Sequence, residues 1–281
     1  MSERRVMIVT GATNGIGFVT AKELARKGAH VVLVARSQER LNHAVSQIQA
    51  SCADASLNTI CADLSSQREV IRVAETLKSA YAHIDVLVNN AGAYFTSRQL
   101  SVDGIEMTWA LNHMAPFLLT TSLLDTLRAS APARVITVSS MAHSWATINF
   151  DDLQGAQRFS GWSAYGQSKL ANILFTYELA DRLQQSEVTV NCLHPGFVAT
   201  GFAHNNAHWF AQVNGLLQKL FAVSPEKGAE TSIFLASDPS VAQVTGRYFV
   251  DCKAVPSSKI SYDVTSRRRL WEVSQKMIVV S

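Results

Sequence analysis

The chain has 281 residues, of which 47% are hydrophobic and 17% are charged, and its net charge is +3. This composition supplies enough apolar side chains for a large buried core and excludes a disordered chain. There is no dense basic stripe with interleaved aromatic residues, so the sequence gives no support to nucleic-acid binding.

The N-terminal run and the cysteines indicate the cell compartment. The apolar run Val6–Val9 is too short for the core of a signal peptide, and no run is long enough to span a bilayer. Cys52, Cys61, Cys192 and Cys252 show neither CxxC nor zinc-ligand spacing, so we interpret them as reduced thiols. We therefore expect a cytoplasmic protein without a transmembrane segment.

Short runs rich in β-branched residues alternate with longer segments of helical periodicity. In chain order they predict strand Val6–Thr10, helix Ile16–Lys27, strand Val31–Ala35, helix Glu39–Ala50, strand Asn58–Ala62, helix Gln67–Tyr81, strand Asp85–Asn89, helices Val102–Asn112 and Pro116–Ser130, strand Arg134–Ser139, helix Ala164–Gln184, strand Val188–Leu193, helix Pro225–Ser237 and strand Arg247–Val250. Strands this apolar are covered on both faces, and strand–helix alternation gives right-handed crossovers. The expected fold is α/β, a Rossmann-type doubly wound parallel sheet of about seven strands with helices on both faces.

No linker rich in Gly, Pro or Ser and no internal repeat divides the chain, so residues 1–281 are expected to form a single dinucleotide-binding catalytic domain. The segment Gly201–Val223 is rich in aromatic and small residues, and we interpret it as a substrate lid. Residues 254–281 form a C-terminal extension. Its basic run Arg267–Arg269 is interpreted as the solvated face of a helix.

The segment Thr10–Gly17 (TGATNGIG) lies between the first predicted strand and the first predicted helix. Gly11 permits a tight turn, Gly15 lets the backbone approach a pyrophosphate, and Gly17 lets the helix pack closely on the strand. The helix N-terminus offers free N–H groups to phosphates. Three glycines alone would fit an ordinary turn, but this context favours a dinucleotide site. The loop residues expected to contact the cofactor are Gly11, Thr13, Asn14, Gly15, Ile16 and Gly17.

The second predicted strand ends at Arg36 and Ser37 rather than at an acidic residue. An acidic side chain there would accept a hydrogen bond from the adenosine ribose 2′-hydroxyl. The guanidinium of Arg36 suits a 2′-phosphate instead, although a solvent-exposed arginine is the alternative. The sequence therefore predicts NADP(H) as the cofactor, with Arg36 and Ser37 at its 2′-phosphate end.

Several motifs occur in a fixed order along the chain, namely Gly11-xxx-Gly15-Ile16-Gly17, Cys61-Ala62-Asp63-Leu64, Asn89-Asn90-Ala91-Gly92, Tyr165-xxx-Lys169 and Pro195-Gly196. Together they resemble the short-chain dehydrogenase/reductase superfamily. In finer detail the chain resembles the retinol dehydrogenase branch. The features that carry this finer resemblance are Val138–His143 (VSSMAH), the long gap from Ser140 to Tyr165, and Tyr248–Lys253 (YFVDCK).

The resemblance implies further roles for individual residues. Asn112 would be the asparagine that kinks a helix and feeds a water relay. The remaining cofactor contacts would be Asp63 and Leu64 at the adenine, Asn90, Ala91 and Gly92 beside the adenosine ribose, and Pro195, Gly196, Val198 and Thr200 at the nicotinamide carboxamide.

Tyr165 and Lys169 are four residues apart in a predicted helix, so they share one helix face. A carbonyl that accepts hydride needs a proton donor, and a free tyrosine has a pKa of about 10. A neighbouring ammonium favours the phenolate and is expected to lower this pKa. We therefore predict that Tyr165 is the general acid and base and that Lys169 assists it and binds the cofactor. A surface pair is the alternative for these two residues taken alone.

Ser140 lies at the end of a predicted strand, on the edge of the sheet where ligands bind in such folds. Side chains alternate along a strand, so only one of Ser139 and Ser140 can face the site. The family's pattern favours Ser140, whose hydroxyl would hold the substrate oxygen. The predicted catalytic residues are thus Asn112, Ser140, Tyr165 and Lys169.

Weaker signals come from histidines and tryptophans. His204 and His208 have the i, i+4 spacing of some metal sites, but no third ligand is evident, so we interpret them as lid residues and expect no metal. His113 and His143 adjoin Asn112 and Ser140, and we interpret them as packed, hydrogen-bonded histidines, with substrate contact as the alternative; His194, before Pro195, is interpreted as structural. Trp145, Trp162 and Trp209 either fill core or line an apolar pocket, and Trp162 is the best pocket candidate.

The sequence and the resemblance predict an NADP(H)-dependent oxidoreductase that transfers hydride between the nicotinamide and an apolar aldehyde, ketone or alcohol. A retinal-like or other lipophilic carbonyl compound is the expected substrate, and reduction is the expected direction. The alternatives are a ketoacyl or steroid reductase and a non-catalytic NADP(H)-sensing regulator, since the fold alone does not decide between them. The resemblance also implies a homodimer or homotetramer.

Overall fold

The computed structural model describes residues 4–196 and 224–279. Its strands form one sheet in the order β3-β2-β1-β4-β5-β6-β7-β8, all parallel except that β8 runs antiparallel to β7. The strands are β1 (Val6–Thr10), β2 (His30–Ala35), β3 (Ser56–Cys61), β4 (Val86–Asn89), β5 (Ala133–Val138), β6 (Val188–His194), β7 (Arg247–Val250) and β8 (Lys253–Val255). The predicted doubly wound α/β fold is confirmed.

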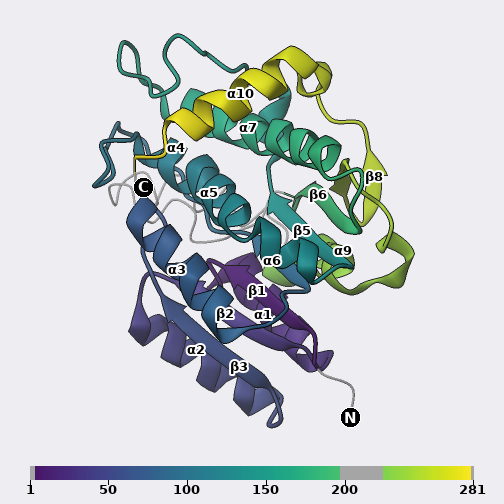
Figure 1. Ribbon diagram of the computed structural model, residues 1–281. Coiled ribbons are helices and arrows are strands. Elements are labelled where there is room, and N and C mark those ends of the chain that lie inside the picture. Colours follow the sequence, from purple (N-terminus) through teal and green to yellow (C-terminus); the bar gives the residue numbers. More distant parts are fainter. Residues whose placement is uncertain (1–3, 197–223, 280–281) are drawn as a thin grey trace.

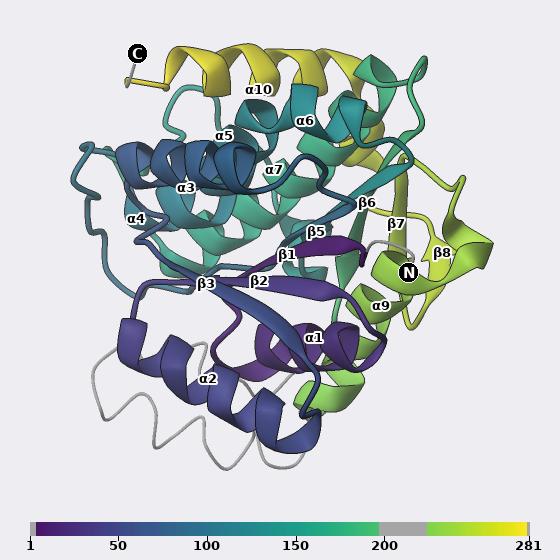
Figure 2. The ribbon, with the colours of Figure 1, turned by 60° about the horizontal axis from the view of Figure 1, so that its bottom comes forward.

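Helices cover both faces of the sheet, as Figures 1 and 2 show. One face carries α1 (Gly15–Arg26), α2 (Gln38–Ser51) and α9 (Pro225–Ser237). The opposite face carries α3 (Gln67–Ala80), α4 (Met107–Trp109), α5 (Ala115–Ser122), α6 (Leu124–Ala129) and α7 (Gly161–Arg182). The last helix, α10 (Val264–Lys276), lies outside α7 as a further layer. None of the described helices combines the length and the hydrophobicity that a membrane-spanning helix requires.

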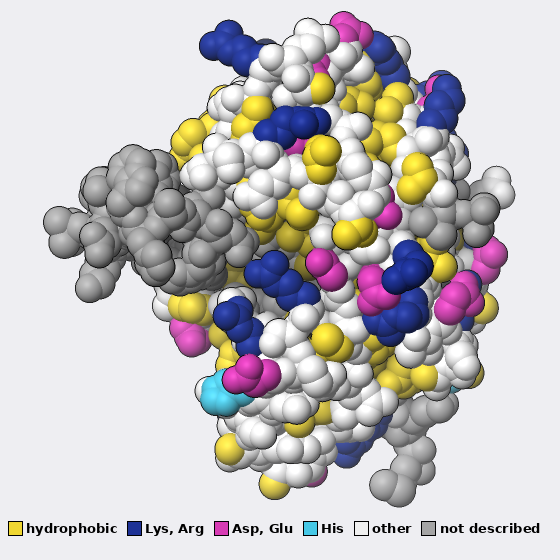
Figure 3. Space-filling model, turned by 90° about the vertical axis from the view of Figure 1, so that its left-hand side faces the viewer, with side chains coloured by type: hydrophobic (Ala, Val, Ile, Leu, Met, Phe, Trp, Pro, Cys, Tyr) yellow, Lys and Arg dark blue, Asp and Glu magenta, His cyan; other side chains and the backbone are white. Residues whose placement is uncertain are grey.

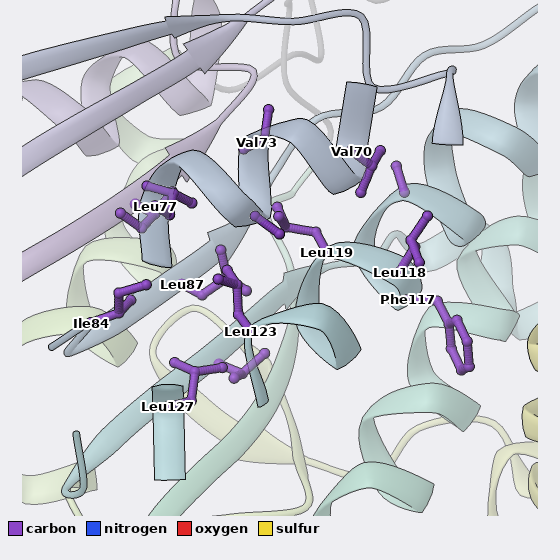
Figure 4. Close-up of a cluster of buried hydrophobic side chains, with 14 of the residues drawn as sticks. Val70, Val73, Leu77, Ile84, Leu87, Phe117, Leu118, Leu119, Leu123 and Leu127 are labelled. Atoms are coloured by element: carbon purple, nitrogen blue, oxygen red, sulfur yellow. The ribbon is translucent and has the colours of Figure 1, made fainter. Parts of the chain in front are cut away.

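The core forms where apolar helix faces meet the sheet. On α3, Val70, Val73 and Leu77 recur at helical spacing, and all three are fully or almost fully buried. They point toward Leu118 and Leu123 of the neighbouring helical segment and toward the sheet (Figure 4). This packing fixes the helices against the strands.

The sheet has one strand more than expected. β8 is antiparallel and exposed, and it follows β7 through a two-residue turn at Asp251 and Cys252. Both turn residues have positive φ, 47° and 60°, as a tight hairpin requires. The three residues of β8 are all exposed and carry no apolar pattern, so hydrophobic periodicity did not reveal this strand.

The predicted helix Val102–Asn112 was wrong in its first half. Gly104, with φ of 73°, turns the chain there, and the helix begins only at Met107. The buried carboxylate of Glu106 caps it by accepting hydrogen bonds from the N–H groups of Thr108 (2.9 Å) and Trp109 (2.8 Å). A π-helical turn, Ala110–Met114, follows.

The predicted helix Pro116–Ser130 is also divided, into α5 and α6 at Leu123.

The C-terminal extension packs into the main core. The Trp271 ring of α10 stacks on Phe175 (6.0 Å between centroids), and the Arg182 guanidinium lies 4.3 Å from the Trp271 ring centroid. Arg267 forms an ion pair with Asp181 at 2.8 Å, and only 12% of its side chain is exposed. The interpretation of the basic run as a solvated face was therefore wrong for Arg267, although Arg268 and Arg269 are exposed.

We expect Trp271→Ala to lower the free energy of unfolding by about 3 kcal/mol, because a buried ring and its stacking contacts are lost. Urea denaturation followed by circular dichroism measures this change. Trp145→Ala is the matched control, since Trp145 is 61% exposed and should change stability by less than about 0.5 kcal/mol. Equal, small losses in both variants would contradict the assignment of the extension to the core.

Candidate active site

The carboxyl ends of the parallel strands bring the predicted residues to one edge of the sheet. β1, β4, β5 and β6 are neighbours in the sheet, and the loops that follow them carry Gly11, Asn90, Ser140 and Pro195. Figure 3 views the molecule from the left-hand side of Figure 1, where hydrophobic side chains line a hollow and Lys and Arg side chains lie nearby. Ligands of open α/β sheets bind at such an edge.

The glycine loop has the backbone shape that a pyrophosphate site requires. Gly11 and Gly15 have φ of 67° and 52°, a region that favours glycine. A Cβ atom on Gly11 would lie 3.0 Å from the Cα of Ala91, and one on Gly17 would collide with the carbonyl oxygen of Gly11 and the side-chain amide of Asn90. The first N–H groups of α1 have no partner within the helix. The cradle therefore fits a dinucleotide phosphate group.

Thr10 and Asn90 hold this loop in place. The Thr10 hydroxyl oxygen accepts hydrogen bonds from the N–H groups of Asn90 (2.9 Å) and Ala91 (3.0 Å), and the Asn90 side-chain amide donates to the Thr10 carbonyl (2.8 Å). Thr10 was not predicted as a site residue. Its place at the strand end, directly before the glycine loop, was the available signal.

Arg36 and Ser37 follow β2, and Arg36 is exposed. The Ser37 oxygen caps α2 by accepting a hydrogen bond from the Arg40 N–H at 3.3 Å. Both residues therefore lie at the carboxyl edge, next to a helix N-terminus that favours an anion.

Asp63 and Leu64 follow β3, and the structure places them differently. Asp63 is exposed, and its carboxylate accepts hydrogen bonds from the N–H and hydroxyl groups of Ser65. Leu64 is only 6% exposed and packs in the main core cluster. Asp63 is thus presented at the surface, whereas most of Leu64 is withdrawn from it.

Tyr165 and Lys169 lie on α7, and both are buried. The Lys169 Nζ is 5.6 Å from the centroid of the Tyr165 ring and donates a hydrogen bond to the carbonyl oxygen of Val138 at 3.0 Å. A Cβ atom on Gly92 would lie 3.3 Å from this Nζ. The absence of a side chain at Gly92 therefore leaves room for the ammonium beside the loop after β4.

Burial changes the protonation of this pair. It raises the pKa of Tyr165 to about 12, although a hydrogen bond with the Ser140 side chain acts in the opposite direction. It also lowers the pKa of Lys169 to about 8. The expected lowering of the Tyr165 pKa by Lys169 was therefore wrong for the protein alone, because desolvation dominates. At neutral pH the phenol keeps its proton and can donate it.

The two serines after β5 point in different directions, as strand alternation predicts. The Ser139 hydroxyl donates a hydrogen bond to the Lys169 carbonyl oxygen at 2.7 Å and so anchors α7. The Ser140 oxygen accepts a hydrogen bond from the N–H of Ala142 at 3.2 Å, which leaves the hydroxyl hydrogen for another partner. The anchoring role of Ser139 was not predicted from the sequence.

Asn112 joins the loop after β4 to α7 from within the π-helical turn. Its side chain is fully buried, accepts a hydrogen bond from the N–H of Ala93 (2.8 Å) and donates to the Ala93 carbonyl oxygen (2.9 Å). It also donates to the Ser168 hydroxyl at 3.1 Å. The π-helical turn widens the helix at this point, in keeping with the kink implied by the family resemblance.

An aromatic group lies beside Tyr165. The Tyr94 ring meets Tyr165 edge-on with 6.0 Å between centroids and lies 5.4 Å from the ring of Trp162. Trp162 is 59% exposed, and Met141 and Trp145, at the two ends of the turn that follows Ser140, are also exposed. Trp145 and Trp162 therefore do not fill the core. Tyr94 was not predicted, because no motif residue or spacing marked it.

The remaining predictions have mixed outcomes. Pro195 and Gly196 follow β6 as expected, and Gly196 has φ of 83°. In residues 4–196 and 224–279, no group of three or more metal-ligating side chains occurs. Several predicted residues lie outside the described residues, namely Val198, Thr200, the lid Gly201–Val223 and, within it, His204, His208 and Trp209.

The histidine interpretations that fall on described residues can be assessed from their contacts. His113 is buried against Trp109, and its Nε2 lies 2.8 Å from the Ser274 hydroxyl. His143 is also buried and hydrogen-bonded. His194 is half-buried, and burial lowers its pKa to about 4. The interpretation of His113 and His143 as packed, hydrogen-bonded histidines is therefore confirmed.

Comparison with known proteins identifies the family. The model of the short chain dehydrogenase family matches residues 5–211. The chain belongs to the short-chain dehydrogenase family. It is similar to mouse retinol dehydrogenase 14 (40% identity, 98% of this chain and 86% of the relative), to human retinol dehydrogenase 13 (39%, 98% and 84%) and to the chloroplastic short-chain dehydrogenase TIC 32 B of Brassica napus (35%, 96% and 88%).

Solved structures show the same relation. An uncharacterised protein from Mycobacterium paratuberculosis superposes with a TM-score of 0.78 (32% identity, 97% of this chain and 92% of that chain). The RhlG protein of Pseudomonas aeruginosa, in an active-site complex with NADP, gives 0.69 (30%, 87% and 93%). This short-chain dehydrogenase is therefore an oxidoreductase of the alcohol–carbonyl class, in a family that uses NAD(P)H.

We expect Tyr165→Phe to lower kcat by about 10²–10⁴-fold, the range for loss of a general acid, because the variant keeps the ring and loses only the proton donor. Binding of NAD(P)H, followed by fluorescence titration, should remain nearly unchanged. Tyr81→Phe is the matched control, because the Tyr81 hydroxyl bonds to Asn58 and His30 in the β2–β3 region instead. Near-normal turnover by Tyr165→Phe would disprove the role.

Proposed function

We propose that this dehydrogenase uses NADPH to reduce lipophilic aldehydes or ketones, retinal-like compounds among them. The observation that carries the proposal is the buried, protonated Tyr165 phenol beside Lys169 and Ser140, in contact with the buried ring of Tyr94, which in turn lies beside the exposed ring of Trp162. A protonated phenol supplies the proton that a carbonyl needs when it is reduced.

The bound nicotinamide supplies a hydride to the carbonyl carbon. Tyr165 gives its phenolic proton to the carbonyl oxygen, and the Ser140 hydroxyl donates a hydrogen bond to the same oxygen. Lys169, held by the Val138 carbonyl, stabilises the phenolate that Tyr165 becomes after it gives up its proton. Asn112 keeps the loop after β4 and helix α7 at a fixed separation through its bonds to Ala93 and Ser168, so that the proton donor stays in line with the substrate.

The preference for NADPH over NADH is proposed from the end of β2. Arg36 and the N-terminus of α2 form an electropositive edge, and a guanidinium binds a phosphate through two parallel hydrogen bonds. An acidic residue, which would favour NADH, is absent from positions 36 and 37. Related structures have been solved with NADP, including the Burkholderia cenocepacia short chain dehydrogenase at 27% identity and a TM-score of 0.67.

The lipophilic substrate class is proposed from the aromatic and apolar side chains around Ser140 and Tyr165. Met141, Trp145 and Trp162 each expose half or more of their surface, and exposed apolar groups beside a site favour apolar ligands. Several relatives are named retinol dehydrogenases, which supports the same class. A ketoacyl or steroid reductase would share the chemistry, and an NADP(H)-sensing regulator would not need the proton donor.

We expect Arg36→Asp to weaken NADPH binding by on the order of 10- to 100-fold, the equivalent of about 1.5–3 kcal/mol for hydrogen bonds to a charged group. NADH affinity should change little, because NADH has no 2′-phosphate. Isothermal titration of both cofactors measures the two effects. Arg26→Asp changes the net charge equally and lies at the far end of α1, so it should spare both affinities. Equal losses for NADPH and NADH would contradict the assignment.

The reaction itself is tested with NADPH and a panel of straight-chain aldehydes of increasing length, together with retinal, a ketosteroid and a ketoacyl thioester. We expect kcat/KM to rise by about fourfold per methylene over the first few carbons, since each buried methylene contributes about 0.8 kcal/mol. Trp162→Ala should flatten this dependence. No loss of NADPH absorbance with any compound would favour the regulator, and a preference for the ketosteroid or the thioester would favour the alternative reductases.

A further inference from the structure

His143 lies three residues after Ser140, in the 3₁₀ turn Met141–Trp145, and is only 3% exposed. Both of its ring nitrogens form hydrogen bonds with backbone groups. Nδ1 lies 2.7 Å from the carbonyl oxygen of Ser140, and Nε2 lies 3.2 Å from the N–H of Ser258 in the C-terminal extension. The ring therefore joins the backbone of Ser140 to a segment more than 110 positions away in the sequence.

These two partners determine the protonation of the ring. A carbonyl oxygen can only accept a hydrogen bond, so Nδ1 must carry the proton. A backbone N–H can only donate, so Nε2 must be unprotonated. His143 is thus a neutral imidazole in the Nδ1–H tautomer. In the opposite tautomer, the lone pair of Nδ1 would face the lone pairs of the Ser140 carbonyl oxygen. On the other side of the ring, the hydrogen on Nε2 would face the N–H hydrogen of Ser258.

The segment that holds Nε2 is itself fixed to α7. The Ser258 carbonyl oxygen accepts a hydrogen bond from the Ser261 hydroxyl at 2.6 Å, and the Ser261 and Ser257 hydroxyl groups lie 2.6 Å apart. The Ser257 hydroxyl lies 2.7 Å from that of Tyr177, which is on the same helix as Tyr165. His143 therefore bonds to a segment that is itself hydrogen-bonded to α7.

We propose that His143 is a positioning residue that fixes the backbone of Ser140, so that the Ser140 hydroxyl faces the substrate oxygen. The inference rests on the role proposed above for Ser140. The Ser140 carbonyl accepts from the Nδ1–H and, at 3.2 Å, from the backbone N–H of His143. The two hydrogen bonds to its carbonyl oxygen prevent the Ser140 peptide group from rotating. The backbone of Ser140, and with it the direction of the Ser140 side chain, is therefore fixed. His143 acts through this peptide and touches neither cofactor nor substrate.

If His143 served only to fill space, it would not matter for catalysis which ring position donates a hydrogen bond and which accepts one. His143 does pack against the Tyr248 ring at 4.9 Å between centroids, so a loss of stability in a variant would fit either role. Two amide substitutions separate them. Asn at position 143 can place its N–H₂ near the Nδ1 position, and Gln can place its carbonyl oxygen near the Nε2 position.

The test compares His143→Asn and His143→Gln for kcat, KM and thermal unfolding, with the aldehyde that the wild type reduces best. We expect Asn, which keeps the donor to Ser140, to stay close to the wild-type kcat, and Gln, which keeps only the acceptor for Ser258, to lose about tenfold in kcat, as a small misplacement of a reacting group can. KM should change little in both, since the Ser140 bond strengthens in the transition state. Equal losses, or a smaller loss in Gln than in Asn, would overturn the proposal.

Two controls separate this proposal from the proposed function. Ser140→Ala should lower kcat in its own right, and an undiminished kcat in that variant would remove the role of Ser140. His30→Asn alters another hydrogen-bonded histidine, near the amino end of the sheet, and should leave kcat unchanged.

A readout independent of activity is the ¹⁵N spectrum of the His143 ring at neutral pH, identified by its absence from His143→Asn. The Nδ1–H tautomer is expected, and an Nε2–H tautomer or an imidazolium would overturn the proposal.

Discussion

The contact between the end of β5 and helix α7 determines the geometry of the whole site. At this contact the Lys169 ammonium donates to the Val138 carbonyl, and the Ser139 hydroxyl donates to the Lys169 carbonyl. These bonds run in opposite directions between the same two elements, so they fix both the distance and the rotation of α7. Ser140, one residue beyond Ser139, is thereby placed next to Tyr165.

The same contact places two ionisable groups in a buried environment, and burial decides their charge. A pKa of about 12 for Tyr165, against about 10 for a free tyrosine, corresponds to about 3 kcal/mol in favour of the protonated phenol. The phenolate is therefore costly before the reaction and is formed only when a proton acceptor is present. Lys169 is shifted toward its neutral form by the same burial, so its charge depends on acceptors such as the Val138 carbonyl. The protonated phenol is the form of Tyr165 that the proposed reduction requires.

Periodicity and motif order predicted most of the fold and the close placement of Ser140, Tyr165 and Lys169, for identifiable reasons. The buried strands are continuous apolar runs, and the i, i+4 spacing of Tyr165 and Lys169 is a local property of a helix. What was missed depends on contacts between distant parts of the chain. The start of α4 is decided by the Glu106 carboxylate and the turn at Gly104, and the pKa of Tyr165 is decided by burial, which no local pattern contains.

The C-terminal extension illustrates the same limit on sequence reasoning and has a consequence for the site. Residues 254–279 lie beyond the part matched by the family model, yet they supply Trp271 to the main core and the Ser258 N–H to His143. Because side chains in a core are close-packed, a segment that contributes a ring to it cannot move without disturbing its neighbours. The extension therefore contacts α7 on one side and the turn after Ser140 on the other. The geometry around Ser140 thus depends on residues that are distant from it in the sequence.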